Sequence, residues 1–465
     1  MKLLIKLSIG LTCCFLGRSA YSQDKSLAGP NNTSWVQQGY GRKLQITDSL
    51  YTYLNFDNFG CKVLVKGQFN GRFRVVSVND TSLVLNPGGI VNYVFKPATT
   101  ADTTCTTSRK DKGSLEENFE IFWQTFRDNY AFFKERNVNW DNVYRHYSPL
   151  VKGISTDAEL AAILREIVGS IKDDHIRLEI PIPKPEQPAI AKKKTSRSKN
   201  EILTDLEKNY LISSKSYNNG IIRWGILKDN VTGYIAITDM NNFASYAPEL
   251  SNDPAKFNAQ YEKIKDSKTP LQQFDDELQG VDQIMKVILA DFAKTTPIVI
   301  DLRFNGGGYE TVALKLLSYF IQEPKPVLSI QAKASNGFTP PQNYVLKPDS
   351  NGANKKVYLL TSHSTASAAE IFALAAMSYK NIVKIGSPTA GIFSEILWKE
   401  LPNGWEFSLS NEVYRNAKGK SFEGTGIPVQ YEMGYPSDRS SFHESFYTEK
   451  PFLDKALERI LKQKK

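Results

Sequence analysis

The stretch "TSHSTASAAEIFALAAM", residues 361–377, contains the information that decides the fold. It follows the apolar run "KKVYLL", which is typical of a buried strand. It continues into a helix in which Ile371, Leu374 and Ala375 recur at the spacing of one buried face. The stretch therefore predicts a strand, a turn of small and hydroxyl residues, and a helix anchored on a sheet.

Ser367 lies at the start of this predicted helix and allows two interpretations. Ser367-Ala-Ala-Glu370 matches the capping box, in which the serine oxygen and the glutamate each satisfy a free backbone N–H. Alternatively, Ser367 is a nucleophile, because free N–H groups and the positive end of the helix dipole favour developing negative charge there. Ala366 and Ala368 leave room for a substrate backbone. The turn alone leaves both interpretations open.

A glycine-rich turn precedes this stretch, in "VIDLRFNGGGYE" (299–310). Three glycines after a buried strand allow unusual backbone conformations and expose N–H groups. No Lys-Ser/Thr pair follows, so a nucleotide-binding loop is disfavoured. We expect Gly306 or Gly307, together with the N–H of Ala368, to bind an oxyanion.

Among the four histidines of the chain, His175 is the candidate functional residue. It follows Asp173 and Asp174 at the end of an amphipathic helix, where a carboxylate can fix the tautomer of the ring. His146, His175, His363 and His443 show no metal-ligand spacing, so neither a metal site nor a cofactor is expected.

The 465 residues suffice for several domains, and their pattern changes along the chain. Residues 23–108 alternate apolar and polar positions between turn residues, which predicts a small β domain. Residues 109–185 are helical, with capping patterns at Ser114-x-x-Glu117 and Thr156-x-x-Glu159. We expect a linker over 186–220 and an α/β core over 221–465, in which strands and helices alternate.

The first 22 residues have the features of a secretory signal peptide: a basic start, a short apolar run and a small-residue exit. The run is too short and interrupted for a membrane span. A lipoprotein signal at Cys13 or Cys14 is disfavoured because Thr12 is not the usual small residue before a lipidated cysteine. We therefore expect a periplasmic or secreted protein. Cys61 and Cys105 can pair in that compartment, but the sequence does not place them together.

Removal of Lys2, Lys6 and Arg18 with the signal lowers the formal charge from +9 to +6. Much of the remaining positive charge lies in "AKKKTSRSKN" (191–200). Because no aromatic residues interleave these charges, a solvated linker is favoured over a nucleic-acid-binding arm.

Four motifs occur in one order: "VIDLRFNGGG", "LTSHSTASAAEIFALAAM", "IGSPTAGIFSE" and "FEGTGIPV". Together they resemble the C-terminal processing and tricorn-core family of serine peptidases, which also includes the repeats of interphotoreceptor retinoid-binding protein. "IKDDHIRL" and the helical segment resemble the tricorn-like branch, and the similarity covers most of 114–435. The resemblance implies a crotonase-like (ClpP-like) peptidase core, preceded here by a helical segment and a small N-terminal β domain.

The resemblance also implies roles for single residues. The family's nucleophile falls on Ser367, and Ile392 stands where one branch carries a lysine base, which excludes a Ser-Lys dyad. The histidine and glutamate of the tricorn-like branch match His175 and Glu423. Because Asp174 replaces a serine found before that histidine, either Asp174 or Glu423 can orient the imidazole.

The implied function is that of an exported serine endopeptidase acting on peptides or unfolded polypeptides. Gly391, Ile392 and Phe393 are expected to pair with the substrate as an added strand. The alternative is a peptidase-like protein that binds a small apolar ligand or a peptide without cutting it. The sequence gives neither the cleavage preference nor the oligomeric state.

Overall fold

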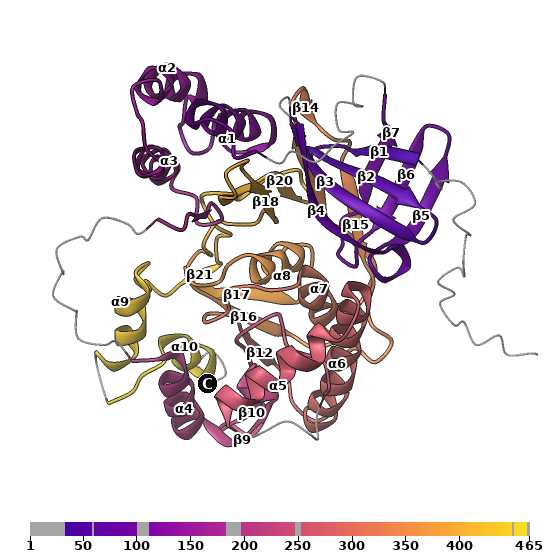
Figure 1. The fold of residues 1–465 in the computed structure, drawn as a ribbon. Helices are drawn as coiled ribbons and strands as arrows, with labels where there is room; N and C mark the ends of the chain where they lie inside the picture. Colours follow the sequence, from indigo (N-terminus) through magenta and orange to yellow (C-terminus); the bar gives the residue numbers. More distant parts are fainter. Residues whose placement is uncertain are drawn as a thin grey trace, which may run out of the picture.

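A computed structural model describes residues 33–57, 60–99, 111–182, 197–246, 253–448 and 451–462. The predicted signal peptide, residues 191–196 of the basic run and Cys105 lie outside these ranges. The expected α/β class with a small N-terminal β domain is confirmed (Figure 1). Cys61 is disulfide-bonded, and the other three cysteines lie outside the described residues.

The N-terminal domain is an antiparallel sheet with strand order β4-β3-β2-β1-β7-β6-β5. Buried and partly exposed residues alternate along its strands because one face of the sheet is buried. Leu83, Leu85 and Phe95 are fully buried, whereas the neighbours of Leu83 and Leu85 in β6 are partly exposed. The strands are β1 (Thr33–Gln37), β2 (Arg42–Thr47), β3 (Leu50–Asp57), β4 (Gly60–Gln68), β5 (Arg74–Asn79), β6 (Ser82–Asn86) and β7 (Tyr93–Pro97).

The β domain is docked tightly on the rest of the molecule through the loop between β6 and β7. Val91 of this loop is part of the same hydrophobic cluster as residues of the α/β core, such as Ile300 and Leu359. Gly88, at φ +109°, lies so close to the ring of Phe274 that an added Cβ would come within 2.2 Å of it. Asn92 and Gln342 exchange two hydrogen bonds of 2.9 and 2.8 Å. The domain is therefore a fixed part of the molecule.

Three helices form the next segment: α1 (Leu115–Asn129), α2 (Trp140–Val151) and α3 (Asp157–Ile171). Thr156 and Glu159 form the complete capping box predicted for α3, and Ser114 accepts the N–H of Glu117 at the start of α1. Phe122 and Phe126 of α1 pack on Phe407 of β19 (Glu406–Ser410), a strand outside the core sheet. This contact holds the helical segment beside the β domain, above the core sheet (Figure 1).

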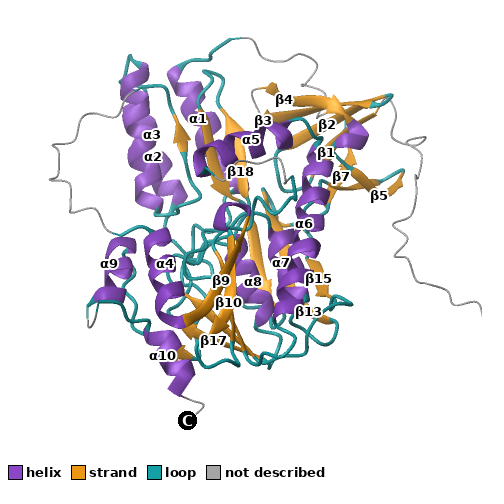
Figure 2. Ribbon diagram, turned by 90° about the horizontal axis from the view of Figure 1, so that it is seen from below, coloured by secondary structure: helices purple, strands orange, loops and turns teal. Residues whose placement is uncertain are grey.

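The core sheet has strand order β21-β17-β16-β12-β11-β10-β9, and β11, β12, β16, β17 and β21 run parallel. Both of its faces are covered. Ile300 and Leu359 pack with α6 (Pro270–Asp291), α7 (Glu310–Ser318) and α8 (Ala368–Ala376). Their neighbours Val299 and Leu360 pack with α4 (Lys199–Tyr210) and α10 (Lys455–Lys462) on the other face (Figure 2). The strands are β9 (Leu211–Tyr217), β10 (Ile222–Leu227), β11 (Gly233–Ile237), β12 (Ile298–Asp301), β16 (Val357–Thr361), β17 (Ile382–Gly386) and β21 (Tyr431–Glu432).

Two smaller sheets connect the core to the domains above it. One contains β13 (Lys325–Ala334), β14 (Gly337–Phe338), β15 (Gln342–Leu346) and β20 (Glu412–Asn416), and the other contains β8 (Leu178–Glu179), β18 (Ile396–Glu400) and β19 (Glu406–Ser410). The remaining helices are α4 (Lys199–Tyr210), α5 (Pro254–Asp266), α6 (Pro270–Asp291), α7 (Glu310–Ser318), α8 (Ala368–Ala376), α9 (Arg439–Glu444) and α10 (Lys455–Lys462).

The predicted linker over 186–220 is wrong for its second half, because residues 199–217 form α4 and β9. Ser198 and Glu201 make a full capping box at the start of α4. Leu203 and Leu206 are buried against the core, and β9 is the last strand of the core sheet. Among the helices of the described residues, none is both long and apolar enough to cross a membrane.

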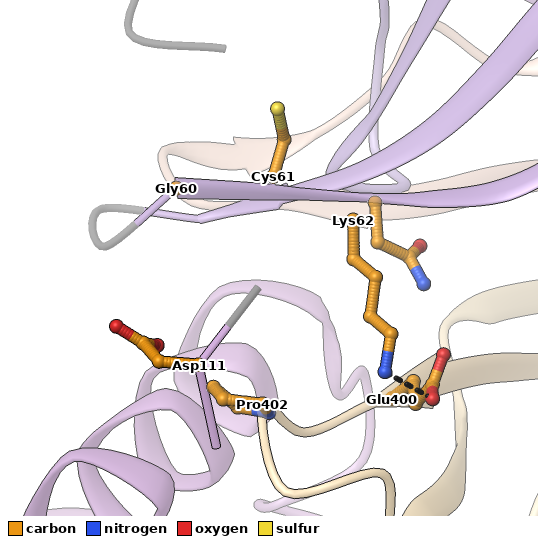
Figure 3. Close-up of a pocket in the computed structure, with 7 residues that line it drawn as sticks. Gly60, Cys61, Lys62, Asp111, Glu400 and Pro402 are labelled. Atoms are coloured by element: carbon orange, nitrogen blue, oxygen red, sulfur yellow. Dashed lines mark hydrogen bonds and ion pairs between the residues drawn. The ribbon is translucent and has the colours of Figure 1, made fainter. Parts of the chain in front are cut away.

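A pocket lies where β4 meets the turn after β18, and two of its lining residues, Lys62 and Glu400, form an ion pair (Figure 3). Its lining residues are Asn55, Gly60, Cys61, Lys62, Asp111, Glu400 and Pro402. Since none of the predicted site residues lines it, this pocket is not the candidate active site.

Candidate active site

The two turns singled out in the sequence emerge at the same edge of the core sheet. Strands β12 and β16 are parallel neighbours, with Asp301 opposite Leu360. The carboxyl ends of adjacent parallel strands meet at one edge of a sheet, where α/β proteins commonly bind ligands. The glycine turn after β12 and the hydroxyl-rich turn after β16 are therefore side by side.

Hydrogen bonds from the hydroxyl-rich turn to backbone carbonyls fasten the two turns together. Ser362 Oγ donates to the Arg303 carbonyl at 2.6 Å, and Thr365 Oγ1 donates to the Leu302 carbonyl at 2.8 Å. The N–H of Ala366 donates to the Asn305 carbonyl at 3.1 Å. The hydroxyls of this turn thus position the backbone.

Ser367 precedes the first residue of α8, but its side chain makes no capping hydrogen bond. The capping-box interpretation is therefore wrong. Its backbone has φ 52° and ψ −124°, a conformation that non-glycine residues rarely adopt and that costs about 1–3 kcal/mol. The Ser367 side chain is partly exposed, and its hydroxyl has no hydrogen-bond partner among the described residues. A strained, unpaired serine at a helix N-terminus is suited to nucleophilic attack.

The glycine turn lies directly against Ser367. A Cβ built on Gly307, at φ +112°, would come within 2.7 Å of Ser367 Cβ and 3.1 Å of the Ala368 nitrogen. The Gly307 N–H donates to Asn305 Oδ1 at 2.8 Å and is therefore not free for an oxyanion. Gly306 is exposed, and neither its N–H nor that of Ala368 has an acceptor among the described residues. Of the predicted donors, Gly306 and Ala368 are thus the two available.

Glu370 interacts with the Ser367 backbone at the start of α8 and also anchors the segment after β17. Its buried carboxylate accepts the hydroxyl of Thr389 and the N–H groups of Gly391 and Ile392, the latter two at 2.8 Å. Burial raises the pKa of the Glu370 carboxyl to about 7, although these hydrogen bonds lower it. The carbonyl of Ile392 accepts the N–H of Ser367 at 3.0 Å. Glu370 and Ser367 are therefore both hydrogen-bonded to the segment that contains Gly391 and Ile392.

The backbone of this segment, predicted to pair with substrate, is already hydrogen-bonded within the chain. Gly391 donates to Glu370 and accepts the N–H of Gly424, and Ile392 bonds Glu370 and Ser367. The N–H of Phe393 donates to Glu423 Oε2 at 3.0 Å. A substrate strand added along Gly391–Phe393 would have to replace these bonds.

His175 lies in the turn that follows α3 and is 7% exposed. Ser408 of β19 donates to its backbone carbonyl at 2.7 Å, which fixes the turn against the core. Burial lowers the pKa of the His175 imidazole, while Asp173 nearby and a hydrogen bond with the Ser394 backbone act in the opposite direction. Ring atom Nδ1 is buried without a partner. Because Ser367 binds Ile392 and His175 binds Ser394, the two residues approach the same short segment.

The two aspartates before His175 have different environments. Asp174 is exposed, whereas Asp173 is 6% exposed. Asp173 Oδ1 accepts the N–H of His175 at 2.9 Å, and Asp173 Oδ2 accepts the hydroxyl of Tyr130 at 2.8 Å. The carboxylate that acts most strongly on the imidazole is therefore Asp173, which was not among the predicted site residues.

Glu423 pairs with a residue of the helical segment. Arg136 Nη2 donates to Glu423 Oε1 at 3.0 Å, and the Glu423 side chain is 2% exposed. Burial, with Asp173 close by, raises the pKa of Glu423 to about 8, although the Phe393 N–H and Arg136 lower it. No hydrogen bond joins Glu423 to the His175 ring among the described residues.

The structure therefore brings Ser367, Gly307 and Ala368 into direct contact and places His175 and Glu423 against residues 392–394 next to them. The His175 ring and Ser367 Oγ are not hydrogen-bonded to each other in this conformation. Sequence reasoning missed Arg136 and the burial of Asp173, because no local pattern distinguishes a buried charge from a solvated one. Within the described ranges, no group of three His, Cys, Asp or Glu residues could hold a metal ion.

Two family models match the chain over these elements. Residues 231–433 match the model of peptidase family S41, and residues 113–169 match that of the tricorn protease C1 domain. The first match contains Gly306, Ser367 and Glu423, and the second ends six residues before His175.

Among curated proteins, the carboxy-terminal processing protease CtpA of Bacillus subtilis is 29% identical over 157 residues, which are 34% of this chain and 30% of that protein. A probable CtpA-like serine protease of Staphylococcus epidermidis is 26% identical over 143 residues, 31% of this chain and 28% of that protein. The match thus spans less than a third of each relative. A solved structure assigned as a peptidase of Parabacteroides merdae, 22% identical, covers 75% of this chain and 97% of its own, with a TM-score of 0.55. This likeness supports the fold.

Proposed function

We propose that this chain, whose residues 113–169 and 231–433 place it in the C-terminal processing and tricorn-like family of serine peptidases, cleaves internal peptide bonds of extended polypeptides. The observation that carries the proposal is the strained, unpaired Ser367 at the N-terminus of α8, packed against the glycine turn. A serine that served only the fold would satisfy its hydroxyl and avoid this backbone conformation.

In the proposed reaction, Ser367 Oγ attacks the scissile carbonyl carbon and transfers its proton to His175. The carbonyl oxygen becomes an oxyanion, stabilised by the N–H groups of Ala368 and Gly306 and by the N-terminus of α8. His175 then protonates the leaving amine, which departs with the C-terminal part of the substrate. Water, deprotonated by His175, hydrolyses the acyl-enzyme and regenerates Ser367.

His175 is suited to be the base because burial favours its neutral form. The imidazolium that forms during attack needs a nearby negative charge. Asp173 supplies it, and Arg136 donates a hydrogen bond to Glu423 nearby. Asp174 is the weaker candidate for this role because it is exposed. The Ser367–His175 hydrogen bond is expected to form with bound substrate, since catalytic hydrogen bonds often tighten only in the complex.

The proposed substrate is a peptide or an unfolded polypeptide segment, bound across the edge of the sheet beside residues 391–393. We further propose that the protein is exported. The pattern of residues 1–22 and the disulfide at Cys61 support an oxidising compartment.

The test compares variants of two neighbouring serines and of two histidines. Ser367→Ala should lower the cleavage rate of denatured casein at least about a thousandfold, and His175→Ala about a hundredfold or more. The controls Ser364→Ala and His363→Ala change residues of the same turn and should retain activity. A fluorophosphonate probe should label the native protein at Ser367.

Hydrolysis that persists in Ser367→Ala would remove the assignment. If the native protein neither cuts nor reacts with the probe but binds casein peptides, the alternative of a peptidase-like binding protein is correct.

A further inference from the structure

We infer that Asp454, at the start of α10, is a positioning residue for the nucleophile, acting through the buried guanidinium of Arg303. The kinetic part of this inference rests on the proposed peptidase function. The structural part, that Asp454 holds the two active-site turns in place, stands without it.

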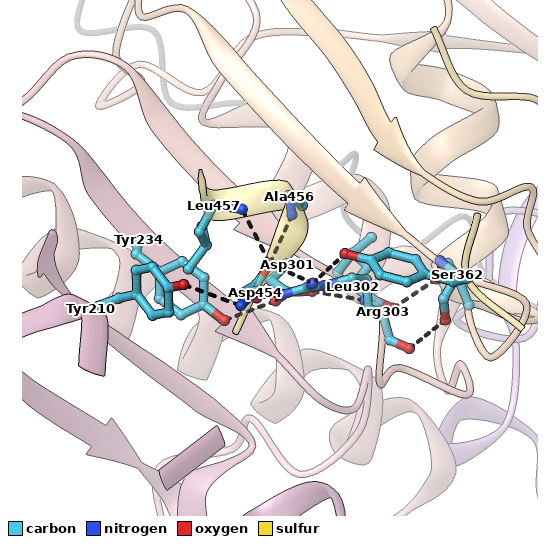
Figure 4. Close-up of polar contacts among 11 residues, drawn as sticks. Tyr210, Tyr234, Asp301, Leu302, Arg303, Ser362, Asp454, Ala456 and Leu457 are labelled. Carbon is cyan, nitrogen blue, oxygen red and sulfur yellow. Dashed lines mark hydrogen bonds and ion pairs between the residues drawn. The ribbon is translucent and has the colours of Figure 1, made fainter. Parts of the chain in front are cut away.

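Arg303 follows β12 and is fully buried (Figure 4). All five of its N–H donors are used. Nε and Nη2 donate to Asp301 at 2.9 and 2.5 Å, and Nη1 and Nη2 donate to Asp454 at 3.1 and 2.7 Å. The remaining donor of Nη1 reaches the Tyr435 hydroxyl at 2.9 Å. Two forked carboxylate contacts fix the plane of the guanidinium as well as its position.

Asp454 joins this guanidinium to a distant part of the chain. Its Oδ1 also accepts the N–H groups of Ala456 and Leu457, at 3.0 and 3.1 Å, so that it caps α10. Its own N–H donates to the hydroxyl of Tyr210 in α4. One fully buried carboxylate therefore starts the last helix and completes the arginine cluster.

From Arg303 the connection to the nucleophile runs through the backbone. The carbonyls of Leu302 and Arg303 accept the hydroxyls of Thr365 and Ser362, which form the turn before Ser367. If the Arg303 side chain changed its position, the backbone carbonyls of Leu302 and Arg303 would shift with it. The turn that holds Ser367 in its strained conformation would then move as well. A displacement of about 1 Å at a reacting group can lower a rate on the order of a hundredfold.

The cluster contains one cation and two carboxylates, all without access to water. A buried charge that loses its partner must find another one or move towards solvent. Asp454→Asn keeps an oxygen that can cap α10. It replaces the other carboxylate oxygen, which accepts a hydrogen bond from Arg303, with an NH2 group that cannot accept one. This substitution therefore separates the arginine contact from the helix cap.

The experiment measures kcat and KM for a quenched casein substrate in Asp454→Asn and in Leu457→Ala. Leu457 is a fully buried residue of α10, so its truncation destabilises the helix and leaves the cluster intact. We expect both variants to melt at lower temperature, but only Asp454→Asn to lose kcat, about tenfold or more at little-changed KM. Tyr435→Phe, which removes a single neutral contact, is the milder variant should Asp454→Asn fail to fold, and it should lower kcat by a smaller factor.

Hydrogen exchange gives a second readout that needs no activity. In a Ser367→Ala background, Asp454→Asn should speed amide exchange in residues 302–308 and 361–369 about tenfold, and Leu457→Ala should not. Equal loss of kcat in the two variants, or unchanged exchange in both segments, overturns the inference. If the native protein does not cut casein, the proposed function has failed, and the exchange data still decide whether Asp454 positions the turns.

Discussion

The backbone conformation of Ser367 is strained, and interactions in the surrounding structure compensate this unfavourable free energy. The pair φ 52° and ψ −124° is accessible to glycine and strained for any residue with a Cβ. We predict that Ser367→Gly increases the free energy of unfolding by about 1 kcal/mol relative to Ser367→Ala, strain relief exceeding the extra entropy of the unfolded glycine. Urea denaturation of the two inactive variants measures it. If Ser367→Gly is less stable than Ser367→Ala, the inference that the backbone is strained at this position is wrong.

His175 should titrate below the ordinary histidine range. Burial disfavours the imidazolium, so the folded pKa lies below 6.5, and the neutral base persists to lower pH than in a free histidine. We predict that the acid limb of kcat/KM lies below pH 6.5. Asp173→Asn should move it further down, because that carboxylate favours the charged ring, whereas Asp174→Asn, at an exposed position, should move it less. An acid limb above pH 6.5 in the native protein would be inconsistent with this environment.

Between elements, the hydrogen bond from Arg136 to Glu423 connects the helical segment to the core. Arg136 follows α1 and also donates to the Lys172 carbonyl at the end of α3, in the turn that carries His175. We predict a coupling free energy of about 1–3 kcal/mol between Arg136→Ala and Glu423→Gln in a double-mutant cycle of unfolding. Both single variants should also lower kcat. As a control pair, Arg127 and Asp128 lie at the surface and should show little coupling.

Local sequence signals predicted the elements well where backbone capping and periodicity determine them. Thr156 and Glu159 form their expected capping box, and Ser114 accepts the N–H of Glu117 as its pattern indicated. The same capping pattern misled at Ser367 and Glu370, since tertiary contacts draw the glutamate to the segment after β17. The start of α4 was also missed: the basic, polar run that contains Ser198 suggested a linker.

For the whole molecule, motif order predicted which turns meet, because adjacent parallel strands bring their ends together. It did not predict which carboxylate acts on His175. That depends on the left-handed residue Lys172, which ends α3 and turns Asp173 inward. Nor did it predict that Val91 of the β domain packs into the hydrophobic core of the peptidase-like part. Contacts between distant segments leave no pattern in either segment alone.

Several buried carboxyl groups distributed over the molecule give its stability an unusual pH dependence. Burial raises the pKa of Glu370 and of Glu412 to about 7 and that of Glu423 to about 8. In the unfolded chain these groups lose their protons near pH 4.5, so between pH 4.5 and 8 the folded state binds more protons than the unfolded state. The free energy of unfolding should therefore fall as pH rises through this window, by about 3 kcal/mol for one such group. His175 contributes with the opposite sign, but only below pH 6.5.

We predict that the melting temperature decreases from pH 5 to pH 8. In Glu412→Gln this decrease should be smaller, because the contribution of the Glu412 titration is removed. Glu412 accepts the hydroxyls of Tyr40 in the β domain and Tyr414 in β20, and hydroxyls can also accept from the amide of a glutamine. The substitution therefore removes the titration while the contact between the β domain and the core is retained. Glu400→Gln, at a partly exposed ion pair with Lys62, serves as the control and should leave the slope unchanged. Melting temperatures that rise steadily over this range would show that these carboxyl groups are ionised in the folded protein.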